Sequence, residues 1–377
     1  MTGGAAHDGP TGTGGAAHDG PTGTGGAAHD GPTGTGGAAH DGPTGTGRVA
    51  RDAAAAEGAG AKPARTGRGG PQVVWIGLVL VALLAAFSVL APRAFPTSFN
   101  LLNLVSDAAI LLLLATGMTF VIITAGIDLS VGGVLVFSAV VAAKVTEGTG
   151  SAALGAAGAL VTGLAWGVLN GVLVALGRIP ALIVTLGTLG MSLGGALLLT
   201  GGVDLRAPAD LNLGLGLARW LGVPLIVWIC AAITAALALA LAFTRFGRHT
   251  YAIGSNAEAA RRAGVAVRGH LIKVYGLAGL LAGLAGHLSL AKYGITGVSA
   301  HSTDNLQAIA AVVIGGTSLF GGVGTVTGTV IGVFIPVVLQ NGFQILGVRP
   351  FWQQVVVGAV LVAAVYLDQW RRRARDQ

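Results

Sequence analysis

Apolar stretches about 20 residues long recur along most of this chain, from residue 73 to residue 369. A helix rises about 1.5 Å per residue and the hydrocarbon core of a bilayer is about 30 Å thick, so each stretch can cross a membrane as a helix. Only 10% of the residues are charged, against about 25% in soluble domains. The fold class predicted from this pattern is all-α, a polytopic transmembrane helical bundle.

About ten spans are expected from apolar windows of this length. Their predicted ranges are 73–91, 104–124, 130–146, 153–177, 180–200, 223–244, 271–290, 305–320, 325–346 and 354–369. The third and eighth ranges are short or rich in glycine, a residue that weakens a helix.

The first 71 residues are predicted to form a disordered cytoplasmic tail. The segment "TGGAAHDGPTG" occurs there four times in succession with a period of 11 residues. Gly, Pro and small residues in such repeats cannot bury a hydrophobic core. Residues 72–372 are predicted to form the transmembrane domain, and residues 373–377 a short C-terminal tail in the cytoplasm.

The basic residues predict the orientation of the spans. The net charge is +7, and Lys and Arg cluster at the ends of apolar runs, notably at Arg178, between 245 and 273, and between 371 and 375. Loops rich in Lys and Arg stay on the cytoplasmic side of a membrane. With ten spans, both termini are then cytoplasmic, and the loop 201–222 lies outside.

The longest of these cytoplasmic loops, at about 247–270, is predicted to contain a short helix. Asn256 can cap a helix that begins at Ala257, and Gly264 can end it as a C′ glycine. Such a helix either docks a partner protein through its small residues or is an ordinary solvated loop helix. The residues expected to contact a partner are Asn256, Glu258, Ala259, Ala260, Arg261 and Gly264.

The stretch "VIITAGIDLSVGGVLVF" places Asp128 between two apolar runs. Gly126 and Gly132 favour an irregular backbone there, which at membrane depth must be buried in protein or line a cavity. The carboxylate is expected to cap the start of the third span by accepting hydrogen bonds from the amides of Ser130 and Val131. Direct contact with a transported substrate is the alternative role.

Small and polar residues within the spans indicate how the bundle packs. "GTVTGTVIG" sets glycines four residues apart, and Gly190 and Gly194 repeat that spacing in the fifth span. This spacing lets helices approach closely, either within one subunit, which we favour, or at a dimer seam. Polar side chains on apolar spans are candidates for a translocation path: Asn103, Asn170 and Gln340. No metal site or cofactor is predicted, since His287 has no second ligand at metal spacing.

Several blocks of the sequence resemble a known family. "NAEAARRAGV" resembles the coupling helix of bacterial ABC importer permeases, and "GIDLSVGG", "RIPALIVTLGT" and "AIAAVVIGGTSLFGGVGTVTGT" resemble the ribose/xylose/arabinose type of these permeases. The resemblance runs from about residue 72 to about residue 372. It implies a type II-like ABC importer permease whose family signature here consists of Gly126, Asp128, Ser130 and Gly132.

The resemblance also implies a function and a set of partners. The chain would move a monosaccharide across the bacterial cytoplasmic membrane with an ATP-binding subunit, an extracytoplasmic sugar-binding protein and a second permease subunit, identical or different. ATP hydrolysis would belong to the separate subunit. In agreement, none of the lysines, Lys62, Lys144, Lys273 and Lys292, follows a glycine as a P-loop requires. Gln307 and Phe320 depart from the family pattern and leave the substrate open.

Two other functions remain as alternatives. An importer of nucleosides or another small polar solute would suit the same scattered polar groups. An ion-coupled secondary transporter would usually carry several carboxylates within its spans, and only Asp107 and Asp128 come close here. An intramembrane aspartyl protease would need a second deep aspartate beside Asp128. The sequence favours a transporter subunit over an enzyme.

Overall fold

The computed structural model describes residues 70–208, 212–297, 301, 303–349 and isolated residues between 352 and 366. The predicted tail up to residue 69, most of the tenth expected span and residues 373–377 lie outside the described residues. The predicted domain boundaries at 71 and 372 therefore stay predictions.

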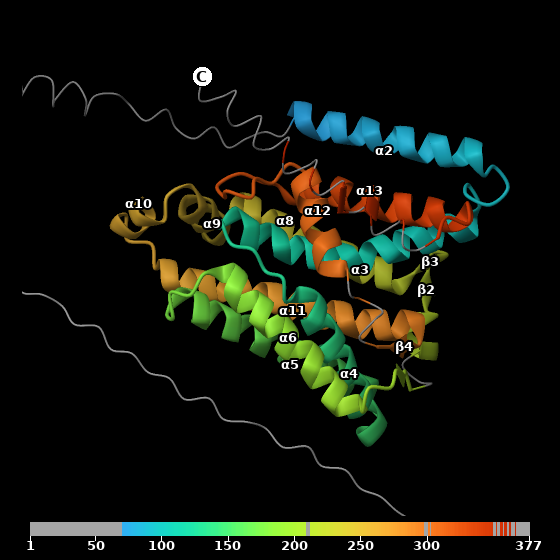
Figure 1. Ribbon diagram of the computed structural model, residues 1–377, viewed down its shortest axis with the longest axis horizontal. Helices are drawn as coiled ribbons and strands as arrows, with labels where there is room; N and C mark the ends of the chain where they lie inside the picture. The colour runs from blue at the N-terminus through green and yellow to red at the C-terminus, as the bar shows by residue number, and fades with distance from the viewer. Residues whose placement is uncertain are drawn as a thin grey trace, which may run out of the picture. The chain divides into compact units, whose positions relative to one another are not determined.

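Eight of the described helices are long and apolar enough to cross a membrane, which confirms the predicted polytopic helical bundle. They are α2 (Gly70–Leu90), α3 (Ser98–Ile123), α4 (Val131–Thr149), α5 (Ala152–Ala175), α6 (Ala181–Thr200), α8 (Leu225–Phe243), α11 (Val267–Tyr293) and α13 (Val326–Ile345). Figure 1 shows α2, α13, α3 and α11 running roughly along one direction, whereas α4, α5 and α6 run obliquely to them.

The shorter elements lie in the connections between these helices. α9 (Arg245–Ser255) and α10 (Ala257–Arg262) follow α8, and a single π-helical turn, η1 (Asn212–Gly216), follows α6. Strand β1 (Leu205–Arg206) pairs antiparallel with β4 (Ile295–Thr296), and β2 (Arg219–Trp220) pairs antiparallel with β3 (Val223–Pro224). Figure 1 shows these strands at the end of the bundle opposite α9 and α10.

The eighth expected span, 305–320, is not a continuous helix. Its helix, α12 (Asp304–Ile314), has 11 residues, which cover only about 16 Å and cannot cross a bilayer core. The chain then continues without regular structure to α13, with positive φ at Gly316, Gly321 and Gly322. The glycines of "GGTSLFGGVG" break the helix, and the irregular backbone is satisfied by protein, as in the 2.8 Å bond from Gly322 N to Ile123 O.

The core of the bundle forms around α3, whose residues from Ala108 to Ile123 are all buried. α11 packs on α3 and, through glycines, very closely on α5. A Cβ atom added to Gly167 of α5 would collide with the carbonyl oxygen of Tyr275. Gly163, Gly167 and Gly171 form this contact at four-residue spacing, a packing site not predicted above although the spacing is visible in the sequence.

The predicted glycine packing is right for one helix and wrong for another. In α13, side chains at Gly328 and Gly332 would meet the backbone of Gly315 and Ala311, so these glycines pack within the chain as expected. In α6, added Cβ atoms at Gly190 and Gly194 would meet nothing within 4 Å. Four-residue spacing permits close packing, but only the position of a second helix decides whether it occurs.

Candidate functional site

Asp128 lies in a non-helical segment, residues 124–130, that joins α3 to α4. Its side chain is 1% exposed. Carboxylate oxygen Oδ1 accepts a hydrogen bond of 2.8 Å from Ser130 N and one of 2.6 Å from the Ser130 hydroxyl. The predicted bond from the Ser130 amide is confirmed. Ser130 itself is the N-cap of α4, so the carboxylate stabilises the turn before the helix, and the expected bond from Val131 N is not formed.

A buried chain of hydrogen bonds continues from Ser130 into two neighbouring helices. Asn170 Nδ2 of α5 donates to the Ser130 hydroxyl over 2.8 Å, and Thr188 Oγ1 of α6 donates to Asn170 Oδ1 over 2.7 Å. All of these side chains are 2% exposed or less. The four residues, Asp128, Ser130, Asn170 and Thr188, are called the polar cluster below. They join the 124–130 segment to α5 and α6.

The three predicted path residues do not lie together. Asn170 belongs to the polar cluster. Asn103 is exposed near the start of α3, and Gln340 is partly buried on α13. Neither of the last two hydrogen-bonds to the cluster in the described structure. The structure therefore does not assemble a polar path from these residues within one chain.

The two signature glycines border different parts of the chain. A Cβ atom at Gly126 would lie 2.5 Å from the Tyr275 hydroxyl, and one at Gly132 would lie 3.3 Å from His301 O. Asn305 Nδ2, at the start of α12, donates to Leu129 O over 3.1 Å. The signature segment, residues 126–132, thus contacts α11 on one side and residues His301 and Asn305, at and before the start of α12, on the other.

The short helix predicted within residues 247–270 is confirmed in its backbone. Asn256 Oδ1 accepts a 2.9 Å hydrogen bond from Ala259 N and caps α10. Gly264 has φ +85°, the left-handed conformation expected of a C′ glycine. Ala259 is exposed, but Ala260 is only 5% exposed. Ala260 packs inward and is not part of the small exposed surface that was predicted.

The charged residues of α10 bond to one another. Glu258 accepts hydrogen bonds of 2.7 and 2.9 Å from Arg261 and one of 3.1 Å from Arg262. The bonds from Arg261 and then Arg262 lower the pKa of Glu258. These side chains are 53 to 78% exposed, so their free surfaces remain accessible to a partner.

The loop that carries α9 and α10 is tied to the end of α3. The Tyr251 hydroxyl of α9 donates to Gly324 O over 2.7 Å, and Gly322 N donates to Ile123 O over 2.8 Å. Gly254 lies against Ile123 O so closely that a Cβ atom there would collide with it. Ile123 is the last residue of α3, directly before the segment that holds Asp128. α9 is therefore in direct contact with the residue that precedes the 124–130 segment.

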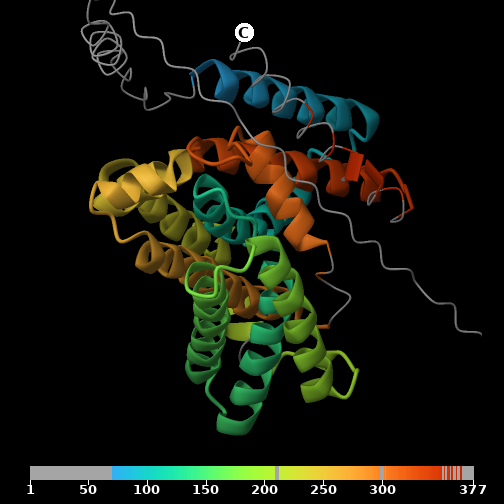
Figure 2. The same cartoon turned by 60° about the vertical axis from the view of Figure 1, so that its left-hand side comes forward.

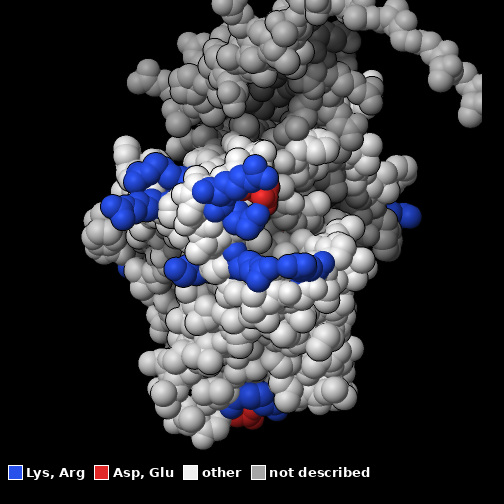
Figure 3. Space-filling view, turned by 90° about the vertical axis from the view of Figure 1, so that its left-hand side faces the viewer, with Lys and Arg blue, Asp and Glu red and all other residues white. Residues whose placement is uncertain are grey.

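Basic side chains gather on the face that carries α9 and α10. Figure 3 shows Lys and Arg in two bands there, with a single acidic patch among them. The exposed basic residues at this end are Arg178, Arg245, Arg248, Arg261, Arg262, Arg268 and Lys273. Figure 2 shows α9 and α10 beside the ends of the long helices, clear of α4, α5 and α6.

Comparison with known proteins places the chain in a family. The family model described as the permease component of branched-chain amino acid transport systems matches residues 100–365. The chain belongs to this permease family. It is a multi-pass membrane transporter component and not an enzyme, in agreement with the predicted class.

Individual relatives cover most of the chain. It is 41% identical over 295 residues to the ribose import permease protein RbsC of Escherichia coli K12, covering 77% of this chain and 92% of the relative. It is 35% identical to the fructose import permease protein FrcC of Rhizobium meliloti over 78% of this chain and 85% of the relative. The autoinducer 2 import system permease protein LsrC of Yersinia enterocolitica is also 35% identical, over 78% of this chain and 82% of that protein. No solved structure matches the chain.

Proposed function

We propose that the chain is the membrane subunit of an ATP-driven importer that moves a monosaccharide into a bacterial cell. The relatives named for ribose and fructose import support the substrate class. The observation that carries the coupling to ATP is the contact of the α9–α10 loop with Ile123, at the entrance to the signature segment. A partner that pushes on this loop would move the segment that holds Asp128.

The proposed partners follow from the two ends of the bundle. An ATP-binding subunit would dock on the exposed basic end, over Asn256, Ala259 and Gly264 of the coupling loop. Under the positive-inside rule this end and both termini are cytoplasmic. A sugar-binding protein would then meet the opposite end, with its paired short strands. The open face of α6 around Gly190 and Gly194 would be available to a second permease subunit.

The proposed mechanism uses the rigidity of the polar cluster. Asp128, Ser130, Asn170 and Thr188 hold the 124–130 segment to α5 and α6 through buried hydrogen bonds. When the coupling loop moves, α3, α5 and α6 would therefore shift together rather than one by one. Such a joint movement is what alternating access between the two sides of the membrane requires.

Uptake in proteoliposomes tests the proposal. The full chain would be reconstituted with the proposed ATP-binding subunit and sugar-binding protein, and uptake of labelled ribose, fructose and arabinose would be measured. We expect uptake that requires internal ATP and the binding protein. Uptake that follows an ion gradient without ATP would instead establish a secondary transporter, and ATP-dependent uptake of nucleosides alone would reject the monosaccharide.

A variant of Gly264 tests the coupling loop itself. An added side chain has room there but must adopt φ +85°, which costs a β-branched residue about 1 to 2 kcal/mol or more. Gly264→Val should abolish uptake at normal membrane levels, whereas Gly264→Asn, which tolerates this conformation, should retain most of it. Equal uptake by wild type and Gly264→Val would contradict the assignment of the loop.

A further inference from the structure

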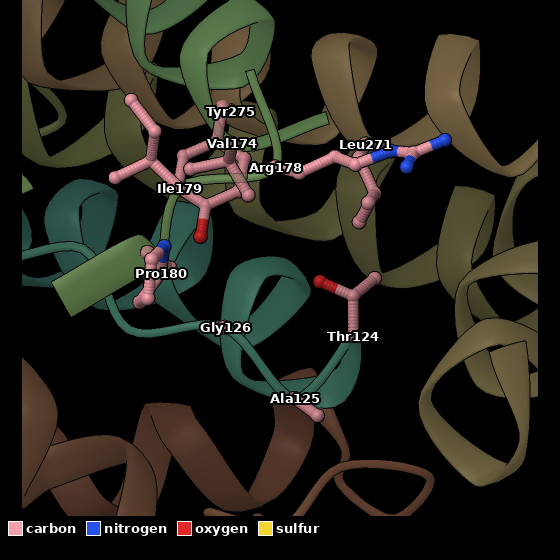
Figure 4. Close-up of a pocket in the computed structure, with 10 residues that line it drawn as sticks. Thr124, Ala125, Gly126, Val174, Arg178, Ile179, Pro180, Leu271 and Tyr275 are labelled. Atoms are coloured by element: carbon pink, nitrogen blue, oxygen red, sulfur yellow. The ribbon is translucent and has the colours of Figure 1, made fainter. Parts of the chain in front are cut away.

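A pocket of about 410 Å³ opens beside the signature segment, between the α3–α4 and α5–α6 connections. Figure 4 shows residues Thr124, Ala125 and Gly126 on one side of it and Val174, Arg178, Ile179, Leu271 and Tyr275 on the other. Its volume is within the range of about 300 to 1,000 Å³ typical of small-molecule sites. The mechanism proposed above for sugar transport assigns no role to this pocket.

The backbone is strained on both walls of the pocket. Three described residues other than glycine have positive φ, and two of them line it: Ala125 at 62° and Arg178 at 54°. The left-handed conformation costs a residue with a Cβ atom about 1 to 2 kcal/mol. Strain of this kind persists where surrounding structure enforces it, and it clusters at ligand sites.

A buried hydroxyl beside the pocket has no partner. Tyr275 is fully buried, and its hydroxyl makes no hydrogen bond with any residue that the structure describes. An unsatisfied buried hydroxyl costs about 1 to 3 kcal/mol. Gly126 packs directly against this hydroxyl, since a Cβ atom there would lie only 2.5 Å from it. Tyr275 is one of the residues that line the pocket, so a ligand there could supply the missing acceptor.

Arginine at the edge of the pocket favours an anion there, away from the Asp128 carboxylate, which acts electrostatically on Tyr275. No acidic side chain occurs among the described residues that line it, and Arg178 stands at its edge. Arg268 lies three residues before Leu271 and seven before Tyr275 in α11, which puts these three on one face of the helix. Gly171 of α5 packs on Ile272, and the two helices run in opposite directions, so Arg178 and Arg268 lie at the same end of the bundle.

We propose that this pocket binds a phosphate-bearing ligand. Arg178 and Arg268 contact the phosphate, because guanidinium groups match phosphate oxygens in geometry and charge. The hydroxyls of Tyr275 and Thr124 contact the polar part of the ligand. Thr124 Oγ1 already donates to Val121 O, and its oxygen can still accept a bond. The ligand would bind directly against the signature segment and so influence coupling, whichever solute is transported.

The phosphate can come from a soluble metabolite or from a lipid headgroup, and the test separates the two. The full chain would be placed in nanodiscs of phosphatidylcholine, with or without phosphatidylglycerol, and its thermal unfolding followed. Ribose 5-phosphate, ribose and inorganic phosphate would be titrated into the phosphatidylcholine discs. Saturable stabilisation by ribose 5-phosphate but not by ribose supports a soluble ligand, and stabilisation by phosphatidylglycerol alone supports a headgroup.

Variants decide whether the effect belongs to this pocket. Arg178→Gln and Arg268→Gln should each weaken binding about tenfold. Tyr275→Phe should weaken it about threefold without lowering the unfolding temperature of the ligand-free protein, since its hydroxyl has no partner to lose. Arg245→Gln, on the same basic end but on α9, is the matched control and should bind normally. The proposal is overturned if neither ligand stabilises the protein, or if Arg245→Gln weakens binding as much as the pocket variants.

Discussion

Replacing Asp128 with alanine should destabilise the bundle, whereas replacing it with asparagine should have little effect on stability. In Asp128→Ala, Ser130 N loses its buried acceptor at 2.8 Å and the Ser130 hydroxyl loses one at 2.6 Å. The backbone amide cannot turn to another acceptor. Leaving that buried donor unsatisfied costs about 1 to 3 kcal/mol, and loss of the second bond adds about 1 kcal/mol. We therefore expect a loss of about 2 to 4 kcal/mol in stability.

Asp128→Asn keeps an acceptor oxygen at the same position, so its stability should fall by less than about 1 kcal/mol and most uptake should remain. The assay is thermal unfolding of the purified chain in nanodiscs, together with uptake at matched membrane levels. Ser138→Ala is the matched control, because this α4 hydroxyl is equally buried but has no partner in the described structure. If Asp128→Asn unfolds normally but loses all uptake, the carboxylate acts on the substrate or its path and the structural role is refuted.

Three further predictions concern other parts of the chain. Gly167→Ala should cost about 1 to 3 kcal/mol in thermal unfolding because its Cβ atom would displace the backbone of α11, whereas Gly77→Ala on α2, with nothing within 4 Å, should cost nothing. Asn256→Ala should lower uptake by loosening α10, whose cap is worth about 1 kcal/mol, and Asn256→Asp should restore it; equal uptake by all three proteins would contradict a role for the cap. Arg261 and Arg262 lower the pKa of Glu258 below its ordinary value of 4.5. The ion pairs of Glu258 with these arginines therefore stabilise α10 fully above pH 4.5, and this stabilisation is lost as the pH falls through the lowered pKa of the folded state. An NMR titration of ¹³C-labelled glutamate should show this low pKa and its rise in Arg261→Gln, and a titration unchanged by that variant would argue against the pairing.

Some parts of the candidate site were predictable because they depend on local sequence. The Asn256 cap and the left-handed Gly264 involve only neighbours along the chain, and both are present as expected. The bond from Ser130 N to Asp128 spans two residues and is equally local. The hydrogen-bond partner of Asn170 and the close neighbour of Tyr275, Gly126, could not be predicted, because they come from segments far away in sequence. Apolar periodicity contains no information about which polar residues of separate helices will meet.

By itself, the sequence determined that this chain is a polytopic helical membrane protein and a permease of its family. Long apolar stretches leave the backbone no other way to satisfy its hydrogen bonds in lipid, and local motifs predict the capped helix α10. Only the tertiary structure decided that α12 stops after 11 residues, that the glycines of α5 pack while two of α6 stay open, and that Asp128 belongs to a polar cluster. These features depend on how closely distant helices approach, and van der Waals contact and buried hydrogen bonds are settled only when the helices are assembled.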